Sequence, residues 1–84
     1  MEFQLMSRAY CSLCQKMLDA LAPWQQAHGF GIEVVDIDRF PALVQRYDER
    51  VPVLLLDGQE VCHWHLDEAR LAEVLAGAGP ASMR

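Results

Sequence analysis

Strand and helix patterns alternate along this chain of 84 residues, and their order is the feature that most constrains its fold. A short apolar run from Phe3 to Met6 precedes a stretch with helical periodicity, and the β-branched run from Ile32 to Ile37 follows it. These segments predict a strand, a helix and a second strand. Because such a crossover joins parallel strands and is nearly always right-handed, we expect the first two strands to pair in parallel.

The helical stretch begins near Ser12 and ends at the glycines that precede the second strand. Pro23 is expected either to kink this helix or to begin a restarted turn, with Trp24 and Ala27 continuing its apolar face. His28 is interpreted as a charge placed favourably beside the carboxyl end of the helix dipole. The apolar positions recur at spacings of three and four residues, which is typical of a helix with one buried face: Leu13, Cys14, Met17, Leu18 and Leu21.

A β-hairpin is expected in the second half of the chain. The strand-like runs from Val51 to Leu56 and from Gln59 to Trp64 are separated only by Asp57-Gly58. An Asp-Gly pair favours the tight two-residue turn that joins antiparallel strands. The hairpin should therefore add two antiparallel strands to the parallel pair and complete a four-stranded mixed sheet.

Two further helices complete the predicted order. Asp38 is expected to cap a short helix over residues 40–47, and Asp67 to cap the last helix. The fold class is thus α/β, in the order β-α-β-α-β-β-α, with helices on both faces of the sheet. We interpret residues 1–84 as a single domain that ends in a frayed tail over residues 80–84.

Charge and composition argue against several classes of function. The chain has 12 acidic and 7 basic residues, and its net charge of −5 comes with scattered cations, so we expect no nucleic-acid partner. No apolar run is long enough to cross a bilayer and no signal-peptide pattern opens the chain, which favours the cytoplasm and no membrane partner. In that reducing compartment, three cysteines do not suggest a structural disulfide framework. A chain this small is expected to be a monomer.

The pair Cys11 and Cys14 carries the candidate chemistry. If a helix begins near Ser12, Cys11 lies at its N-terminus, where unpaired amide groups and the helix dipole favour a thiolate. Cys14 then lies one turn further, on the inward face. Two cysteines this close can form a disulfide and so carry two electrons. We therefore predict thiol–disulfide exchange, with Cys11 as nucleophile and Cys14 as resolving thiol.

A non-enzymatic module that binds a partner or a metal is the alternative. Cys11, Cys14, Cys62, His63 and His65 could supply four zinc ligands, and an iron–sulfur cluster shared by two protomers is a variant of this hypothesis. The Cys-His-Trp-His segment lacks standard ligand spacing, and neighbouring residues of a strand point to opposite faces. We therefore expect no metal ligands. Cys62 is interpreted as a small buried apolar residue, with a resolving or regulatory thiol as the alternative.

The aromatic segment that ends the hairpin is expected to continue the strand. With period two, His63 and His65 would share a solvated face, and Trp64 would pack on the core or beside the cysteine pair.

Together these features resemble the thioredoxin fold in its small, glutaredoxin-like form, over nearly the whole chain. The resemblance rests on the CxxC motif after the first strand, on Val51-Pro52 before the third, and on the closing hairpin and helix. Further stretches are similar to a group of small bacterial glutaredoxin-like proteins: Val35-Asp36-Ile37-Asp38, Tyr47 followed by Arg50-Val51-Pro52-Val53-Leu54, and Trp64 before the last helix.

The resemblance implies a set of substrate-binding residues. Pro52 would have a cis peptide bond that turns the Val51 backbone toward a disulfide-bonded substrate. Arg8 matches a position where glutaredoxins often have lysine, and its charge would favour the Cys11 thiolate. Tyr10, beside Cys11, joins this set. Asp67 would partly replace an aspartate that helps to hold the γ-glutamyl carboxylate of glutathione.

The chain also departs from the glutaredoxin pattern. Ser12-Leu13 replaces the usual proline and aromatic residue between the cysteines, and Cys62-His63 replaces a Gly-Gly pair. The side chains of Cys62 and His63 are larger than those of the glycines and would occupy space that the backbone offers to glutathione. We therefore expect no cofactor, and glutathione remains an open alternative as co-substrate. The expected partner is a disulfide-containing protein or small molecule.

Overall fold

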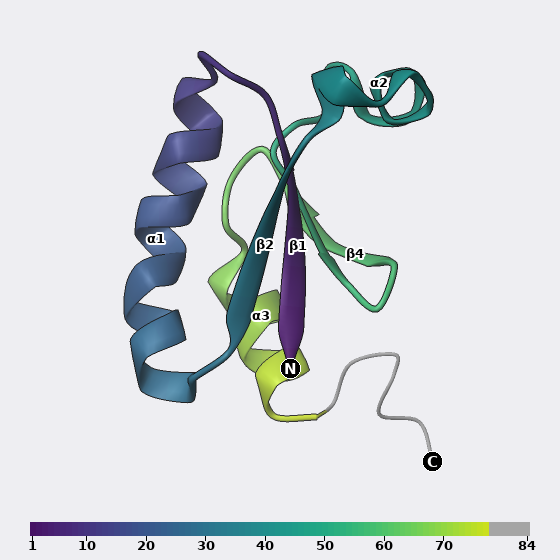
Figure 1. Ribbon diagram of the computed structural model, residues 1–84. Helices are drawn as coiled ribbons and strands as arrows, with labels where there is room; N and C mark the ends of the chain where they lie inside the picture. Colours follow the sequence, from purple (N-terminus) through teal and green to yellow (C-terminus); the bar gives the residue numbers. More distant parts are fainter. Residues whose placement is uncertain (78–84) are drawn as a thin grey trace.

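The computed structural model describes residues 1–77 of the chain, so the expected tail over residues 80–84 lies outside the described part. The order of elements follows the prediction, with one added 3₁₀ turn, η1 (Figure 1). The elements are β1 (Glu2–Ser7), α1 (Ser12–His28), β2 (Gly31–Asp36), η1 (Ile37–Arg39), α2 (Pro41–Tyr47), β3 (Val53–Leu56), β4 (Gln59–His63) and α3 (Glu68–Leu75).

The four strands form one mixed sheet in the order β2-β1-β3-β4. β1 and β2 are parallel, whereas β3 is antiparallel to both β1 and β4. The predicted crossover and hairpin are therefore confirmed. Asp57 and Gly58 both have positive φ values, 53° and 80°, as the mirror-image turn of a two-residue hairpin requires.

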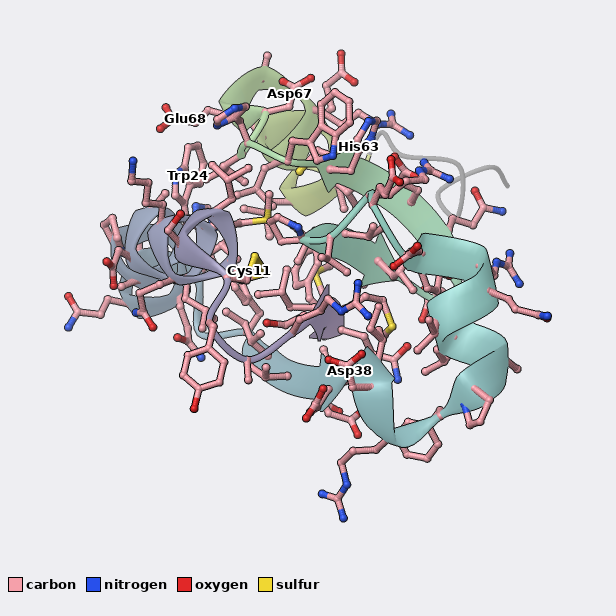
Figure 2. All side chains as sticks on the ribbon, turned by 90° about the horizontal axis from the view of Figure 1, so that it is seen from above. Cys11, Trp24, Asp38, His63, Asp67 and Glu68 are labelled. Atoms are coloured by element: carbon pink, nitrogen blue, oxygen red, sulfur yellow. A yellow bond between two sulfur atoms is a disulfide. The ribbon has the colours of Figure 1, made fainter. Side chains whose placement is uncertain are left out.

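The helices cover both faces of the sheet, as predicted. Viewed from above, α1 and α2 lie on opposite sides of the strands (Figure 2). Successive residues of β1 point to opposite faces, so Leu5 enters the cluster beneath α1 and α3 while Met6 enters the cluster beneath α2. The first cluster contains Phe3, Leu5, Met17, Leu21, Phe30, Leu54, Val61, Cys62, Leu71 and Val74, and the second Met6, Cys14, Ile37, Tyr47, Val51, Val53 and Leu55.

The long helix α1 continues through Pro23 without a break. Pro23 has no N–H group, so the carbonyl group four residues before it lacks its helical hydrogen bond. Both positions are exposed, so this carbonyl group can bond to water instead. Trp24 packs against the core, but Ala27 is exposed, and its expected place on the apolar face is wrong. The reason is helical geometry, because a residue six positions after Leu21 lies about 120° around the axis from it. Gly29 ends the helix in the left-handed conformation, and its amide donates to the Gln25 carbonyl.

The expected role of Asp38 as a helix cap is wrong. Asp38 lies within η1, and the side chain of Asp36 caps that turn by accepting from the Asp38 amide at 3.0 Å. The helix α2 begins only at Pro41, with Phe40 as an N-cap that makes no side-chain hydrogen bond. A residue before proline favours an extended backbone, as Phe40 has here, which separates Asp38 from the start of α2.

The strand β3 begins at Val53, two residues later than predicted. Pro52 has no N–H group to donate, so it does not extend the ladder. Opposite β3, β4 contains one extra residue, because Leu54 lies opposite Cys62 while Leu55 lies opposite Glu60.

Within residues 1–77, no helix has both the length and the apolar character that crossing a bilayer requires.

The cap of α3 provides a test of the fold. The Asp67 carboxylate accepts a hydrogen bond from the Arg70 amide at 3.0 Å, as predicted for an N-cap. The substitution Asp67→Ala should lower the free energy of unfolding by about 1 kcal/mol. In thermal unfolding this corresponds to a decrease in Tm of about 4–8 °C for a domain of this size. Asp67→Asn retains an oxygen acceptor and should lose much less, and an equal loss in both variants would contradict the capping role.

Candidate active site around the Cys11–Cys14 pair

The two cysteines lie at one end of the sheet, where several segments converge. β1 and β2 are parallel, so the loops that follow them begin at the same edge. Because β3 runs in the opposite direction and β4 runs back, the start of β3 and the end of β4 reach this edge as well. Figure 2 looks down on this end and shows Cys11 near the centre, at the start of α1. The fold therefore places the cysteine pair among residues from four parts of the chain.

Cys11 and Cys14 are joined by a disulfide, with their Cα atoms 5.2 Å apart. Cys11 is the N-cap of α1, and its Sγ accepts a hydrogen bond from the Cys14 amide at 3.2 Å. After reduction, the same amide and the positive end of the helix dipole would stabilise a thiolate on Cys11. Cys14 is only 3% exposed, whereas Cys11 is partly exposed. One sulfur is thus accessible and the other is buried.

A hollow of about 600 Å³ lies beside the pair. Arg8 and Tyr10, both predicted as substrate-binding residues, line it together with Cys11 and Cys14. Tyr10 is fully exposed, and its φ of 60° is unusual for a residue other than glycine. Such strained conformations concentrate at functional sites. The complete lining is Ser7, Arg8, Ala9, Tyr10, Cys11, Ser12, Cys14, Gln15 and Leu18.

Val51 and Pro52 precede β3, at the end of the sheet where the cysteine pair lies. The peptide bond between them is cis, the isomer that the resemblance implies. Val51 belongs to the same buried cluster as Cys14. The Pro52 carbonyl accepts a hydrogen bond from the Trp64 amide at 2.9 Å. Among the hydrogen bonds of the described residues, none uses the amide or carbonyl of Val51.

Arg8 forms an ion-pair group that the sequence analysis did not anticipate. Its Nη2 donates to Asp38 Oδ1 at 2.6 Å, and its Nη1 donates to Asp48 Oδ1, also at 2.6 Å. The hydrogen bond from Arg8 holds the pKa of the Asp38 carboxyl below its ordinary value. The expectation was that the Arg8 charge favours the Cys11 thiolate, but in the structure two carboxylates balance that charge. No local pattern could reveal this group, because its members are 30 and 40 positions apart in the sequence.

The structure places Asp67 apart from Cys11 and outside the hollow (Figure 2). It lies beside Glu68 at the start of α3. Its carboxylate already caps the helix.

Trp64 departs from the predicted alternation of side chains. β4 ends at His63, and Trp64 has a φ of 66°, so period two does not extend to His65. Trp64 is 48% exposed, and its indole Nε1 donates to the Glu49 carbonyl at 3.0 Å. His63 Nδ1 lies 2.6 Å from the carboxylate of Glu60.

The residues of the zinc alternative are not brought together. Within the described part of the chain, no group of three or more His, Cys, Asp or Glu side chains is arranged to hold a metal ion. Cys62 is buried in the cluster beneath α1 and α3, as predicted for a small apolar residue. Burial raises the pKa of its thiol, which lowers its reactivity.

Comparison with known proteins shows the same architecture. A family model described as "Glutaredoxin-like domain (DUF836)" matches residues 2–76. A protein of Nitrosomonas europaea, solved by solution NMR, has 32% sequence identity and a TM-score of 0.79, covering 87% of this chain and 88% of its own. An X-ray structure of a protein from X. campestris has 37% identity and a TM-score of 0.73, covering 92% and 99%. The holo form of glutaredoxin C1 from Populus tremula × tremuloides shares the fold at 18% identity, with a TM-score of 0.61 and coverage of 92% and 85%.

The different surroundings of the three cysteines predict an order of alkylation. In reduced, folded protein, iodoacetamide should modify Cys11 first, because this thiol is accessible and lies at the helix N-terminus. Cys14 and Cys62 should both react more slowly because they are buried, and the raised pKa of the Cys62 thiol lowers its reactivity further. Mass spectrometry of peptides from timed samples measures the order. Labelling of Cys62 at the rate of Cys11 in the folded protein would contradict this assignment.

Proposed function

We propose that this chain, which belongs to the glutaredoxin-like domain family, is a thiol–disulfide oxidoreductase that uses Cys11 and Cys14. The observation that carries the proposal is the disulfide at the start of α1, in which one sulfur is accessible and the other is buried. This asymmetry assigns different roles to two chemically identical side chains.

The reaction begins when the Cys11 thiolate attacks one sulfur of a substrate disulfide. The substrate S–S bond breaks, a mixed disulfide with Cys11 forms, and the leaving sulfur departs as a thiolate that takes up a proton. Cys14 then loses its proton and attacks the Sγ atom of Cys11. The Cys11–Cys14 disulfide forms and the second substrate sulfur is released as a thiol. Two electrons pass from the protein to the substrate, and a cellular dithiol or two monothiols must return two electrons before the next cycle.

The backbone around Cys11 supports its role as nucleophile. The Cys14 amide donates to Cys11 Sγ, and the amide groups of the first turn of α1 point toward the same end. These donors stabilise negative charge on Cys11 Sγ when it attacks the substrate disulfide. They also stabilise it when a disulfide of Cys11 is broken and Sγ is the leaving group. Cys14 is held one turn away, so it can reach the mixed disulfide without a rearrangement of the sheet.

Substrate docking is assigned to the residues next to the pair. The free amide and carbonyl of Val51, which precedes Pro52, are suited to pairing with an extended segment of a disulfide-bonded substrate. Tyr10, which lines the same hollow as Cys11, offers an exposed aromatic surface. The substrate class is a disulfide in a protein or a small molecule, and we place the reaction in the cytoplasm, with the protein acting as a monomer.

The reduction potential of the pair tests the proposal directly. Protein equilibrated in glutathione buffers should show a reversible transition of two electrons between about −180 and −280 mV. Counting of free thiols after acid quenching measures the transition. Thiols that pair only on denaturation would instead support a binding module with no redox activity.

Single substitutions test the two roles. In Cys11→Ser, the rate of substrate disulfide reduction should fall to that of the uncatalysed exchange, because no nucleophile remains at the helix N-terminus. Cys14→Ser should accumulate a mixed disulfide between Cys11 and the substrate, detectable by mass spectrometry, because nothing resolves it. Cys62→Ser is the matched control and should retain the wild-type rate. Full activity of Cys11→Ser would show that the pair is not the site.

A further inference from the structure

The hollow beside Cys11 contains a single charged side chain among the described residues that line it, that of Arg8. Lys16 of α1, Arg39 of η1 and Arg46 of α2 do not belong to the lining. Among the described residues, Arg8 is therefore the only cation that lines the hollow beside Cys11. Its availability decides whether an anionic substrate finds a partner there.

Arg8 is paired with the carboxylates of Asp38 and Asp48. Its Nε and Nη2 donate to Asp38, and its Nη1 donates to both the carboxylate and the carbonyl of Asp48, which makes five hydrogen bonds in total. The two hydrogen bonds from Nε share one N–H group, so at most four of the five N–H groups of the guanidinium are used and one on Nη2 is left for a ligand. One positive and two negative charges also leave the group with a net negative charge. The lowered pKa of the Asp38 carboxyl is consistent with an ionised state at neutral pH.

A second cation near this end of the sheet is also engaged. Arg50 pairs with Glu60, and the same carboxylate contacts His63. Like Arg8, Arg50 is therefore held by a side chain of the protein itself. Among the described residues, Arg8 and Arg50 therefore both have their guanidinium groups paired with carboxylates of the protein.

Disulfides differ in charge, and the charge decides how they interact with such a site. Glutathione disulfide carries four carboxylates and two ammonium groups, so it is anionic and needs cations or free amide donors to dock. A neutral or basic polypeptide disulfide needs no such partner and is not repelled by Asp38 and Asp48. It can use the Val51 backbone and the exposed ring of Tyr10.

We propose that Asp38 and Asp48 determine the charge selectivity of the Cys11 site. By holding Arg8 they act against anionic disulfides and favour neutral or basic ones, in particular disulfides within polypeptides. Both are positioning residues, since they act through Arg8 and do not contact the reacting sulfurs. This inference rests on the proposed function, because it assumes that Cys11 attacks a substrate disulfide.

Three small disulfides of different charge test the selectivity. Reduced protein is mixed with excess glutathione disulfide, which is anionic, bis(2-hydroxyethyl) disulfide, which is neutral, or cystamine, which is cationic. The loss of protein thiols gives the rate, and each rate is divided by that of dithiothreitol to remove the intrinsic reactivity of the disulfide. The normalised wild-type rates should decrease from cystamine to the neutral disulfide to glutathione disulfide.

Removal of either carboxylate should invert part of this order. In Asp38→Asn and Asp48→Asn, the glutathione disulfide rate should rise by about 3- to 10-fold and the cystamine rate should fall, with little change for the neutral disulfide. Asp57→Asn removes the same charge from the hairpin turn at the opposite end of the sheet, and it should leave all three rates unchanged. An equal change in all three rates of the Asp38 and Asp48 variants would mean that these carboxylates act on Cys11 itself, and would overturn the proposal.

Ionic strength provides a test that needs no variant. Added salt screens charges beyond about 8 Å at 0.15 M, so it should raise the wild-type rate with glutathione disulfide and lower the rate with cystamine. Salt-independent rates for both substrates would overturn the selectivity. A wild-type protein that leaves all three disulfides intact would instead overturn the proposed function, so the two failures are distinguishable.

Discussion

The parallel pairing of β1 with β2 is the constraint on which the arrangement of the site depends. Ser7 at the end of β1 lies opposite Asp36 at the end of β2, so the segments that leave both strands begin side by side. One of them carries the cysteine pair and the other forms η1. The antiparallel hairpin brings Pro52 and His63 to the same edge, because Val53 pairs with both Met6 and His63. The sheet therefore surrounds the first turn of α1 with segments from distant parts of the sequence.

The helix end and the core together distinguish the two cysteines. Cys11 is the N-cap of α1, where backbone amide groups lack helical partners and one of them reaches its sulfur. Cys14 lies among the buried side chains beneath α2. The backbone and the packing thus give the two cysteines different surroundings. Arg8 lines the same hollow, and its charge is paired with Asp38 and Asp48.

Much of the fold could be predicted from local patterns, and the exceptions have physical reasons. Asp38 follows a strand and precedes a helix, which is the usual place for a cap, yet a 3₁₀ turn and the extended Phe40 separate it from α2. Its carboxylate instead binds Arg8, 30 positions earlier in the sequence. Exposed polar residues that pair over such distances show no periodicity. Likewise, alternation predicted Trp64 to continue a strand, whereas it adopts a left-handed backbone and donates to the Glu49 carbonyl.

The sequence by itself determined the order of elements, the hairpin turn at Asp57-Gly58, the cap at Asp67 and the place of the CxxC motif at a helix N-terminus. These features depend on side-chain periodicity, backbone preference and capping, which act within a few residues. Only the tertiary structure decided which partners hold Arg8, how far Asp67 lies from the cysteine pair, and that Cys62 is buried apart from Cys14. These outcomes depend on which distant segments the sheet brings together, and no short stretch of sequence contains that information.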